Sequence, residues 1–262
     1  MNRELCLIRG GGDLATGVAW RLTRAGFPVV VTELAEPLTV RRAVALSTAV
    51  DNGAVDIEGM VGQRASSIDE AIDIAQSGDV GVVVSADLPS VGASVVIDAR
   101  LAKTNIDTTI EDADLVVGLG PGFAAGENCH VVIETMRGPR LGRAIWNGSA
   151  MPDTGTPGEV GGKGAARVLR APATGIASWN YSIGDLVNER DVLGTVGSSE
   201  ILSPFDGMVR GLIREGQQVK AGCKLGDIDP RTDANYKEIS DKALSVGGGV
   251  LEAVLTWQNR LS

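Results

Sequence analysis

The sequence predicts an α/β fold: a mainly parallel sheet with helices, then a small all-β module, then C-terminal helices. Short apolar runs alternate with helical patterns in the first half, which is typical of a parallel sheet. From residue 167 onward the pattern changes to short strands and turns, and the last residues return to helical spacing. Aromatic residues make up only 3% of the chain, so the core must be aliphatic, as in sheets buried on both faces.

A glycine-rich turn follows the first apolar run, residues 5–8, and precedes an expected helix. Its Gly10, Gly12 and Ala15 match the G-x-G-x-x-A pattern of Rossmann-like folds. A side chain at these glycines would hold a pyrophosphate away from the helix N-terminus, whose partial positive charge attracts anions. The pattern therefore predicts a Rossmann-like domain, which we place at residues 1–150.

Further residues complete the predicted cofactor or nucleotide site. Gly11 lies within the turn, and Asp13 opens the helix, where it is either a ligand-facing residue or simply the N-cap. A second apolar run ends in Glu33, the place where dinucleotide folds hold a ribose. Arg41 and Arg42 follow and suit a phosphate, although adjacent helical residues face different directions, so we expect only one of them to reach it.

A second glycine-rich run, with Gly118, Gly120 and Gly122, follows a later apolar run. Open α/β sheets bind ligands beyond the carboxyl ends of their strands, so this run predicts a second ligand-facing loop. The single histidine, His130, and Glu134 come next, and in a strand their side chains would share one face. They are the catalytic candidates. The alternative is a tight turn followed by a hydrogen-bonded histidine.

The second half contains an internal repeat, in which residues 171–175 are echoed by residues 203–207 at an offset of 32 residues. Such a repeat resembles the barrel-sandwich hybrid of biotinyl/lipoyl-type domains, and we place this module at residues 167–229. Those domains carry their prosthetic group on a lysine in the hairpin between the halves. Residues 191–213 contain no lysine, which excludes biotin or lipoate attachment there. The module is interpreted as a scaffold or docking element.

Two remaining segments complete the predicted organisation. Residues 151–166 are expected to form a linker or loop, and residues 230–262 a helical segment that packs on the Rossmann-like domain. The three glycines at 247–249 precede the expected final helix. They would form either an anion cradle or, as we favour, a tight turn between helices.

Composition limits the compartment and the partners. A formal net charge of -9 disfavours nucleic acid, because binding to phosphate backbones needs a basic face. Cys6, Cys129 and Cys223 are far apart and odd in number, so neither a metal site nor a disulfide framework is expected. The chain starts without a signal-peptide pattern, and no apolar run approaches the roughly 18 residues of a membrane span. We expect a cytoplasmic protein with no membrane partner.

Five segments together resemble a bacterial family. These are GGGDLATG at 10–17, PLTVRRAV at 37–44, GLGPGFAAG at 118–126, HVVIETMRG at 130–138 and ISDKALSVGGGVLEA at 239–253. The family is that of the selenium-dependent molybdenum hydroxylase system proteins, the YqeB family. The resemblance implies an association with molybdenum hydroxylases that need labile selenium. It also implies a Rossmann-like part similar to XdhC-type proteins of molybdenum-cofactor maturation, which usually carry a histidine where this chain has Asp13.

Three functions follow as hypotheses. The first is an accessory protein that matures such hydroxylases, binds a molybdopterin-type cofactor or another phosphate-bearing ligand, and docks a client enzyme or its maturation factors. The second is an NAD(P)-dependent oxidoreductase with Glu33 on the ribose and His130 as general acid or base. The third is a non-catalytic assembly scaffold. Whether the chain is an enzyme, and whether it forms a homo-oligomer, stays open.

Overall fold

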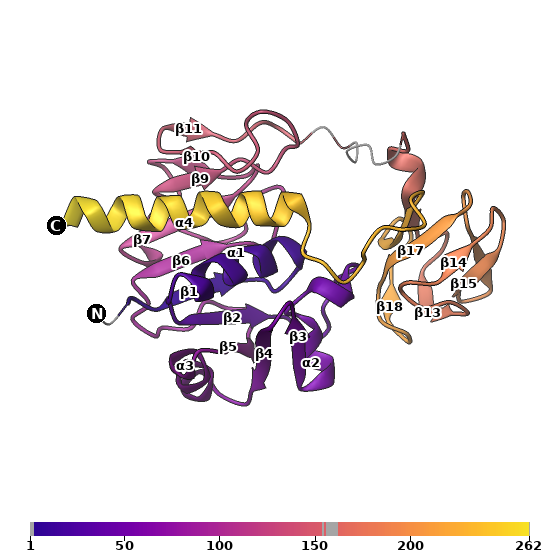
Figure 1. The fold of residues 1–262 in the computed structure, drawn as a ribbon, viewed down its shortest axis with the longest axis horizontal. Coiled ribbons are helices and arrows are strands. Elements are labelled where there is room, and N and C mark those ends of the chain that lie inside the picture. The colour runs from indigo at the N-terminus through magenta and orange to yellow at the C-terminus, as the bar shows by residue number, and fades with distance from the viewer. Residues whose placement is uncertain (1–2, 154, 156–161, 262) are drawn as a thin grey trace. The chain divides into compact units, whose positions relative to one another are not determined.

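The computed structural model describes residues 3–153, 155 and 162–261 and divides into two compact units (Figure 1). The sheet unit comprises the described residues of Met1–Pro37, Ala45–Asp153 and Ile239–Ser262. The β unit comprises those of Leu38–Val44 and Thr154–Glu238. Part of the predicted linker, residues 154 and 156–161, lies outside the described residues.

Within the described residues, the sheet unit is built on a nine-stranded mixed sheet. In spatial order its strands are β10 (Ala144–Ile145), β9 (Val131–Ile133), β7 (Leu115–Leu119), β6 (Val95–Asp98), β1 (Cys6–Arg9), β2 (Val29–Glu33), β5 (Val80–Val84), β4 (Met60–Ala65) and β3 (Ala54–Ile57). Neighbours from β9 to β4 pair in parallel, whereas β10 and β3 run antiparallel at the two ends. A separate short pair, β8 (Ala124–Ala125) and β11 (Gly148–Ser149), is antiparallel.

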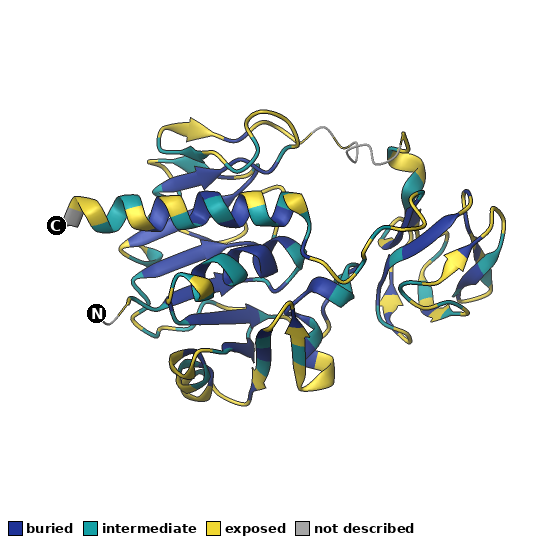
Figure 2. Cartoon of the chain, in the orientation of Figure 1, coloured by how far each residue is buried: buried dark blue, intermediate teal, exposed yellow. Residues whose placement is uncertain are grey.

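Helices cover the sheet and bury its aliphatic strands (Figure 2). They are α1 (Asp13–Arg24), α2 (Thr48–Asn52), α3 (Ile68–Ser77) and α4 (Asp241–Leu261), with the short 3-10 helix η2 (Ile110–Asp112). Two further 3-10 helices, η1 (Arg42–Val44) and η3 (Ala165–Arg167), belong to the β unit. The α3 helix packs on β2, β4 and β5, where its alanines meet Val30. The α4 helix packs along α1 and on β7, β9 and β10. Strands such as β1 are consequently buried along their whole length.

The glycines at 247–249 lie inside α4, so they form neither an anion cradle nor a turn. Glycine is required there because the helices come very close. A Cβ at Gly247 would collide with the carbonyl of Gly17 on α1, and one at Gly17 would collide with Ala243 on α4. Gly249 meets the backbone of Gly142 in the same way. These residues therefore fix α4 to the sheet unit by close packing.

The β unit consists of two four-stranded antiparallel sheets within the described residues. One sheet has the order β12 (Val168–Arg170), β19 (Lys224–Asp229), β17 (Gly207–Leu212) and β14 (Leu186–Val187). The other has the order β16 (Ser199–Leu202), β15 (Val192–Val196), β13 (Gly175–Trp179) and β18 (Gln218–Val219). A shared aliphatic core, including Leu193, Val209 and Leu225, lies within this unit. Val40 belongs to the same core, which places the segment after β2 in the β unit.

The fold class predicted from the sequence is wrong as stated. In a Rossmann fold the strands follow one another outward from the first strand. Here β5 lies beside β2 while the β4–β3 hairpin occupies the edge, and no α-helix is described between β6 and β9. The cover on that side comes from α4, at the far end of the chain, and a single described helix replaces the predicted C-terminal helices. The observed architecture is a mixed α/β sheet unit with a unit of two antiparallel sheets.

Among the residues that the structure describes, none of the helices combines the length and the apolar character needed to cross a membrane.

Candidate functional site

The candidate site lies at the carboxyl edge of the sheet, between β1 and β6. On one side β1 pairs with β2, the next strand along the chain, and on its other side it pairs with β6, a later strand. This reversal of strand order is where open α/β sheets bind their ligands. The last residues of the two strands, Arg9 and Asp98, occupy paired positions in the parallel register and are both buried.

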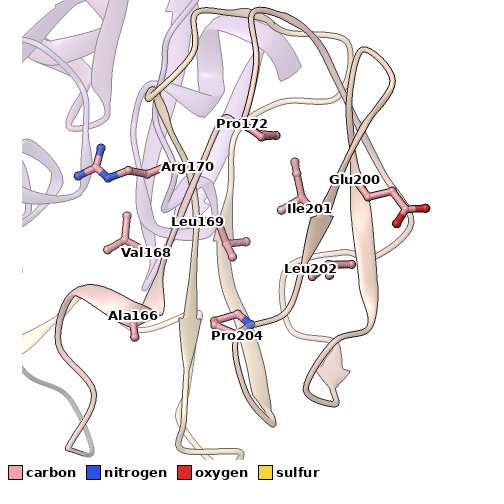
Figure 3. Close-up of a pocket in the computed structure, with 9 residues that line it drawn as sticks. All are labelled: Ala166, Val168, Leu169, Arg170, Pro172, Glu200, Ile201, Leu202 and Pro204. Atoms are coloured by element: carbon pink, nitrogen blue, oxygen red, sulfur yellow. The ribbon is translucent and has the colours of Figure 1, made fainter.

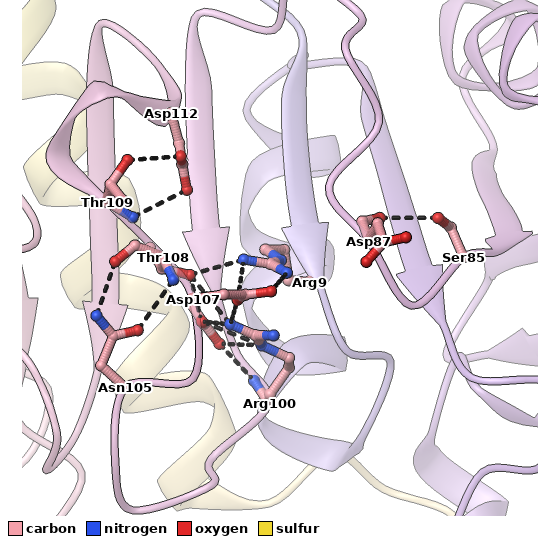
Figure 4. Close-up of polar contacts among 10 residues, drawn as sticks. Arg9, Ser85, Asp87, Arg100, Asn105, Asp107, Thr108, Thr109 and Asp112 are labelled. Atoms are coloured by element: carbon pink, nitrogen blue, oxygen red, sulfur yellow. Dashed lines mark hydrogen bonds and ion pairs between the residues drawn. The ribbon is translucent and has the colours of Figure 1, made fainter.

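A network of hydrogen bonds and ion pairs converges at this edge (Figure 4). Arg9 donates from Nη1 to Thr108 Oγ1 at 2.8 Å and from Nη2 to Asp107 Oδ2 at 3.0 Å. Arg100 donates from Nη2 to Asp107 Oδ1 at 2.7 Å and from Nε to both oxygens of Asp98 at 3.1 Å. Thr108 Oγ1 in turn donates to Asp98 Oδ2 at 2.7 Å. Two guanidinium groups from different strand ends therefore share one carboxylate, that of Asp107.

Burial differs sharply within this network. The side chain of Arg9 is 3% exposed, whereas that of Asp107 is 48% exposed. Hydrogen bonding from Arg9, supported by Arg100, lowers the pKa of Asp107 to about 2. Burial alone would lower the pKa of Arg100, but hydrogen bonds and charges from Asp98 and Asp107 raise it. The edge thus holds two permanent cations around an anionic position that solvent reaches.

Asp107 belongs to a connection that we call loop 99–109, which joins β6 to the start of η2. Leu101 and Lys103 adopt positive φ of 54° and 67°, a backbone region that costs energy for residues with a Cβ. Near the end of the loop, the Asn105 side chain donates to the carbonyl of Thr108 at 2.7 Å and accepts from the Thr108 amide at 3.0 Å. Hydrogen bonds to Thr108 hold the end of the loop in place, and the strained residues lie earlier in it.

The predicted glycine turn lies next to this network. Gly10 has a φ of 89°, and a Cβ there would stand 3.2 Å from the Cα of Arg100. The amide of Gly11 donates to Glu33 Oε2 at 2.8 Å, and the other oxygen of Glu33 accepts from the amide of Leu34 at 2.7 Å. Gly12 has open space where a Cβ would be. The structure therefore brings the glycine turn and Glu33 together at the edge where Arg9 ends β1.

This arrangement does not fit the predicted dinucleotide chemistry. The prediction places the carboxylate of Glu33 on a ribose. In the structure this carboxylate accepts from the amide of Gly11 in the turn itself. Asp13 is not the N-cap either, because Gly12 holds that position and no side-chain cap bond is made. Asp13 is the acidic residue of the first turn of α1, where a negative charge favours the helix dipole.

Arg41 and Arg42 are placed in the β unit. The guanidinium of Arg42 donates from Nε to the carbonyl of Leu212 on β17 at 2.8 Å. Arg42 also opens η1, a single 3-10 turn. The Nε group of Arg42 is therefore engaged by the backbone of the β unit.

The second glycine run serves close packing. A Cβ at Gly118 would collide with the ring of Phe123, and one at Gly120 would stand 2.5 Å from Thr135 Oγ1. A Cβ at Gly122 would stand 2.7 Å from the Cα of Thr104. Gly122 therefore packs directly against loop 99–109, which carries Asp107 and Thr108 of the network.

His130 and Glu134 are not brought together. The strand between them is only β9, Val131–Ile133, and they flank its opposite ends, roughly 13 Å apart at the usual rise of a strand. His130 Nδ1 accepts from the amide of Val116 at 2.9 Å, and burial lowers the pKa of His130. The wholly buried carboxylate of Glu134 accepts from the amides of Met136 and Met151, both at 2.8 Å. Both side chains hold backbone in place.

Sequence reasoning missed the residues that form the network: Arg9, Asp98, Arg100, Asp107 and Thr108. A signal was present, because Arg9 and Asp98 are charged residues that each end a run of buried aliphatic residues. A charged residue that ends a buried strand lies at the carboxyl edge of the sheet, so it is a candidate for a ligand site. The partners on loop 99–109 carry no comparable pattern.

Other reactive groups of the described residues form no second site of this kind. No cluster of three or more His, Cys, Asp or Glu side chains there is arranged to hold a metal ion. Burial raises the pKa of Cys6 to about 12 and that of Cys129 to about 11, so both thiols stay protonated near neutral pH.

The β unit has a cavity of about 240 Å³ between the edge strands β12 and β16 (Figure 3). It is lined by Ala166, Val168, Leu169, Arg170, Pro172, Glu200, Ile201, Leu202 and Pro204. Its charged side chains, Arg170 and Glu200, are directed away from each other. The cavity therefore lacks the convergent polar groups that define a binding site.

No family model matches the chain. Among solved structures, it is similar to an aspartoacylase family protein from Mesorhizobium loti, with 15% identity, a TM-score of 0.30, and coverage of 88% of this chain and 86% of that one. It is also similar to a succinylglutamate desuccinylase/aspartoacylase from Rhodobacter sphaeroides, with 14% identity, a TM-score of 0.22, and coverage of 85% and 51%. Scores this low transfer neither fold nor activity to this chain.

The function predicted from the sequence needs correction with the fold. The amide of Gly11 and the carboxylate of Glu33, which belong to the predicted cofactor site, bond to each other, and His130 and Glu134 flank opposite ends of β9. The prediction of a maturation role, with its oxidoreductase and scaffold alternatives, is therefore wrong as stated.

By sequence, the chain is similar to the uncharacterized protein YqeB of Escherichia coli (strain K12), with 45% identity over 258 residues. The match covers 97% of this chain and 48% of that protein, so the chain spans about half the length of its relative. A link to selenium-dependent hydroxylases is not part of what this match shows. The chain is therefore a homologue of about half of YqeB.

Proposed function

We propose that the sheet unit binds a small anionic molecule, bearing a carboxylate or a phosphate, at its carboxyl edge between β1 and β6. The observation that carries this proposal is the convergence of Arg9 and Arg100 on the half-exposed carboxylate of Asp107. Guanidinium groups bind carboxylates and phosphates through two parallel hydrogen bonds, which gives both strength and geometry. A ligand anion at the position of Asp107 would meet both arginines.

The distribution of charge supports this site. Arg9 and Asp98 are buried at the ends of strands, so they are held in fixed positions by the sheet. Asp98 binds Arg100 and accepts from Thr108, and it stays in the site when an external anion replaces Asp107. Asp107 is the partner that solvent reaches, so it is the group that a ligand anion can replace. The ligand anion then keeps both guanidinium groups paired, and no buried charge is left uncompensated.

The place in the fold is the second support. The reversal of strand order lies beside Arg9, where the chain continues into the glycine turn. Gly12 in particular has open space at its Cβ position. The site therefore combines a fixed cationic pair with an approach that no bulky side chain of the turn fills.

Calorimetric titration with inorganic phosphate, citrate and succinate tests the proposal. We expect at least one of them to bind, and the Arg100→Gln variant to bind it at least tenfold more weakly. Arg137→Gln is the matched control, because Arg137 also forms an ion pair in the sheet unit, with Asp241 on the surface. The control should bind as the unchanged protein does. Failure of all three anions to bind the unchanged, folded protein would overturn the proposal.

A further inference from the structure

Large aliphatic side chains are exposed around the same edge of the sheet. Leu34 follows β2 and is 51% exposed, and Ile106 lies on loop 99–109 and is 62% exposed. Leu101 on the same loop and Val84 at the end of β5 are each 36% exposed. Single exposed aliphatic residues are ordinary on a protein surface, but a group of them at one edge of the sheet needs an explanation.

The sheet order places three of these residues beside the arginine pair. The strands β6, β1 and β2 are consecutive neighbours, about 4.8 Å apart, so their ends span roughly 10 Å. Leu101 and Ile106 follow the first of these strands, Arg9 ends the second, and Leu34 follows the third. Val84 pairs one position beyond the row of Arg9, Thr32 and Val83, so its side chain lies on the other face of the sheet. An aliphatic rim, Leu34, Leu101 and Ile106, thus borders the cationic pair on both sides.

We infer that the ligand of this edge is amphipathic: an acid group binds Arg9 and Arg100 in place of Asp107, and an aliphatic part rests on the aliphatic rim. The inference rests on the proposed anion site and adds the chemical class of its ligand. Charge complementarity places the acid group, because the two guanidinium groups are the cations of this edge that face solvent through Asp107. The rim then lies where the remainder of a bound acid would extend.

Loop 99–109 carries residues of both parts of the site, Asp107 for the acid group and Ile106 for the aliphatic part. Asp107, which the acid group replaces, follows Ile106 directly, so release of the carboxylate also frees the most exposed side chain of the rim. The positive φ at Leu101 and Lys103 gives the loop a strained conformation that a ligand can relax. Replacement of Asp107 and contact with Ile106 are therefore coupled through one short segment.

A series of straight-chain carboxylates separates the binding contribution of the acid group from that of the aliphatic chain. We would titrate butyrate, hexanoate and octanoate, below their micelle-forming concentrations, into the protein and follow binding by calorimetry. Full burial of a methylene strengthens binding about fourfold, so we expect at least a twofold gain for each one on a rim that stays partly open. The variants Leu34→Ser and Ile106→Ser should reduce this gain. Leu255→Ser, a 40% exposed leucine on α4, is the control that should leave it unchanged.

The outcomes distinguish the amphipathic ligand from the anion site on which it rests. Binding of short anions with no gain from chain length would overturn the amphipathic ligand and leave the anion site standing. Octanoate that binds Arg100→Gln as well as the unchanged protein would show adsorption without the arginine pair, which also overturns it. If a second copy of the chain occupies the rim, sedimentation will show association that Ile106→Ser abolishes. That result would overturn the small amphipathic ligand.

Discussion

Arg9 and Asp98 end neighbouring strands at paired positions, and a single hydroxyl group joins them. Thr108 Oγ1 accepts from Arg9 at 2.8 Å and donates to Asp98 at 2.7 Å, and it also accepts from Arg100 at 3.1 Å. Thr108 is 1% exposed, so each of these bonds is shielded from water. The hydroxyl thus connects two buried charges of opposite sign, 89 positions apart in sequence, through a residue of loop 99–109.

Removal of this hydroxyl should destabilise the sheet unit. Thr108→Val keeps the shape of the side chain but leaves two buried charged groups each short of one partner. Hydrogen bonds to charged groups contribute about 1.5–3 kcal/mol, so we expect a loss of about 2–4 kcal/mol in the free energy of unfolding. Urea denaturation followed by circular dichroism measures it. Thr104→Val, at an exposed position of the same loop, should change stability by less than about 0.5 kcal/mol. Equal stability of the two variants would contradict the connecting role of Thr108.

Acid should weaken the protein partly through Asp107. Its pKa is lowered in the folded state from 3.8 to about 2, so its contribution to stability is present above pH 4 and is lost as the pH falls toward 2. The side chain is half exposed, and solvent screening reduces the contribution to the order of 1 kcal/mol. Asp107→Asn should therefore show a smaller loss of stability between pH 4 and pH 2. Identical pH profiles of the variant and the unchanged protein would rule out this linkage.

Glu33 should act on the glycine turn as a hydrogen-bond acceptor. Its carboxylate accepts from the amides of Gly11 and Leu34, at 2.8 Å and 2.7 Å. Glu33→Ala leaves the Gly11 amide without this acceptor and should cost about 1–3 kcal/mol in the free energy of unfolding. Glu33→Gln retains an acceptor oxygen and should cost less than half as much. A thermal or urea melt of both variants decides it: equal losses would mean that the charge, rather than the acceptor, matters.

How much the sequence predicted depends on the range of the interactions involved. The helix expected after the glycine turn is α1, and the apolar run ending in Glu33 is β2, because patterns local in sequence define such elements. The partners of Arg9 were not predictable in this way. Asp107 lies 98 residues further along the chain, and only the register of β1 with β6 brings it near.

The same limit explains the errors about His130 and the second glycine run. The expectation that His130 and Glu134 share a face requires one strand to contain both, but β9 is three residues long, so the histidine precedes the strand and Glu134 follows it. The glycines around Gly120 look like a ligand loop in sequence, because glycines that admit a ligand and glycines that admit a neighbouring backbone have the same pattern. Only the positions of Phe123, Thr135 and Thr104 show which is which.

The glycines of α4 allow the sharpest test of packing, because two neighbours within one helix should respond in opposite directions. At Gly248, nothing lies within 4 Å of where a Cβ would be. Gly248→Ala should therefore stabilise the protein by up to about 1 kcal/mol, the usual preference of a helix for alanine. At Gly247, a Cβ would collide with the carbonyl of Gly17 on α1. Gly247→Ala gains the same helix preference, but overpacking at a buried helix contact costs about 1–3 kcal/mol, so the net change should be destabilising. Urea denaturation of both variants measures the two signs, and stabilisation by Gly247→Ala would show that α4 does not pack against α1 as closely as described.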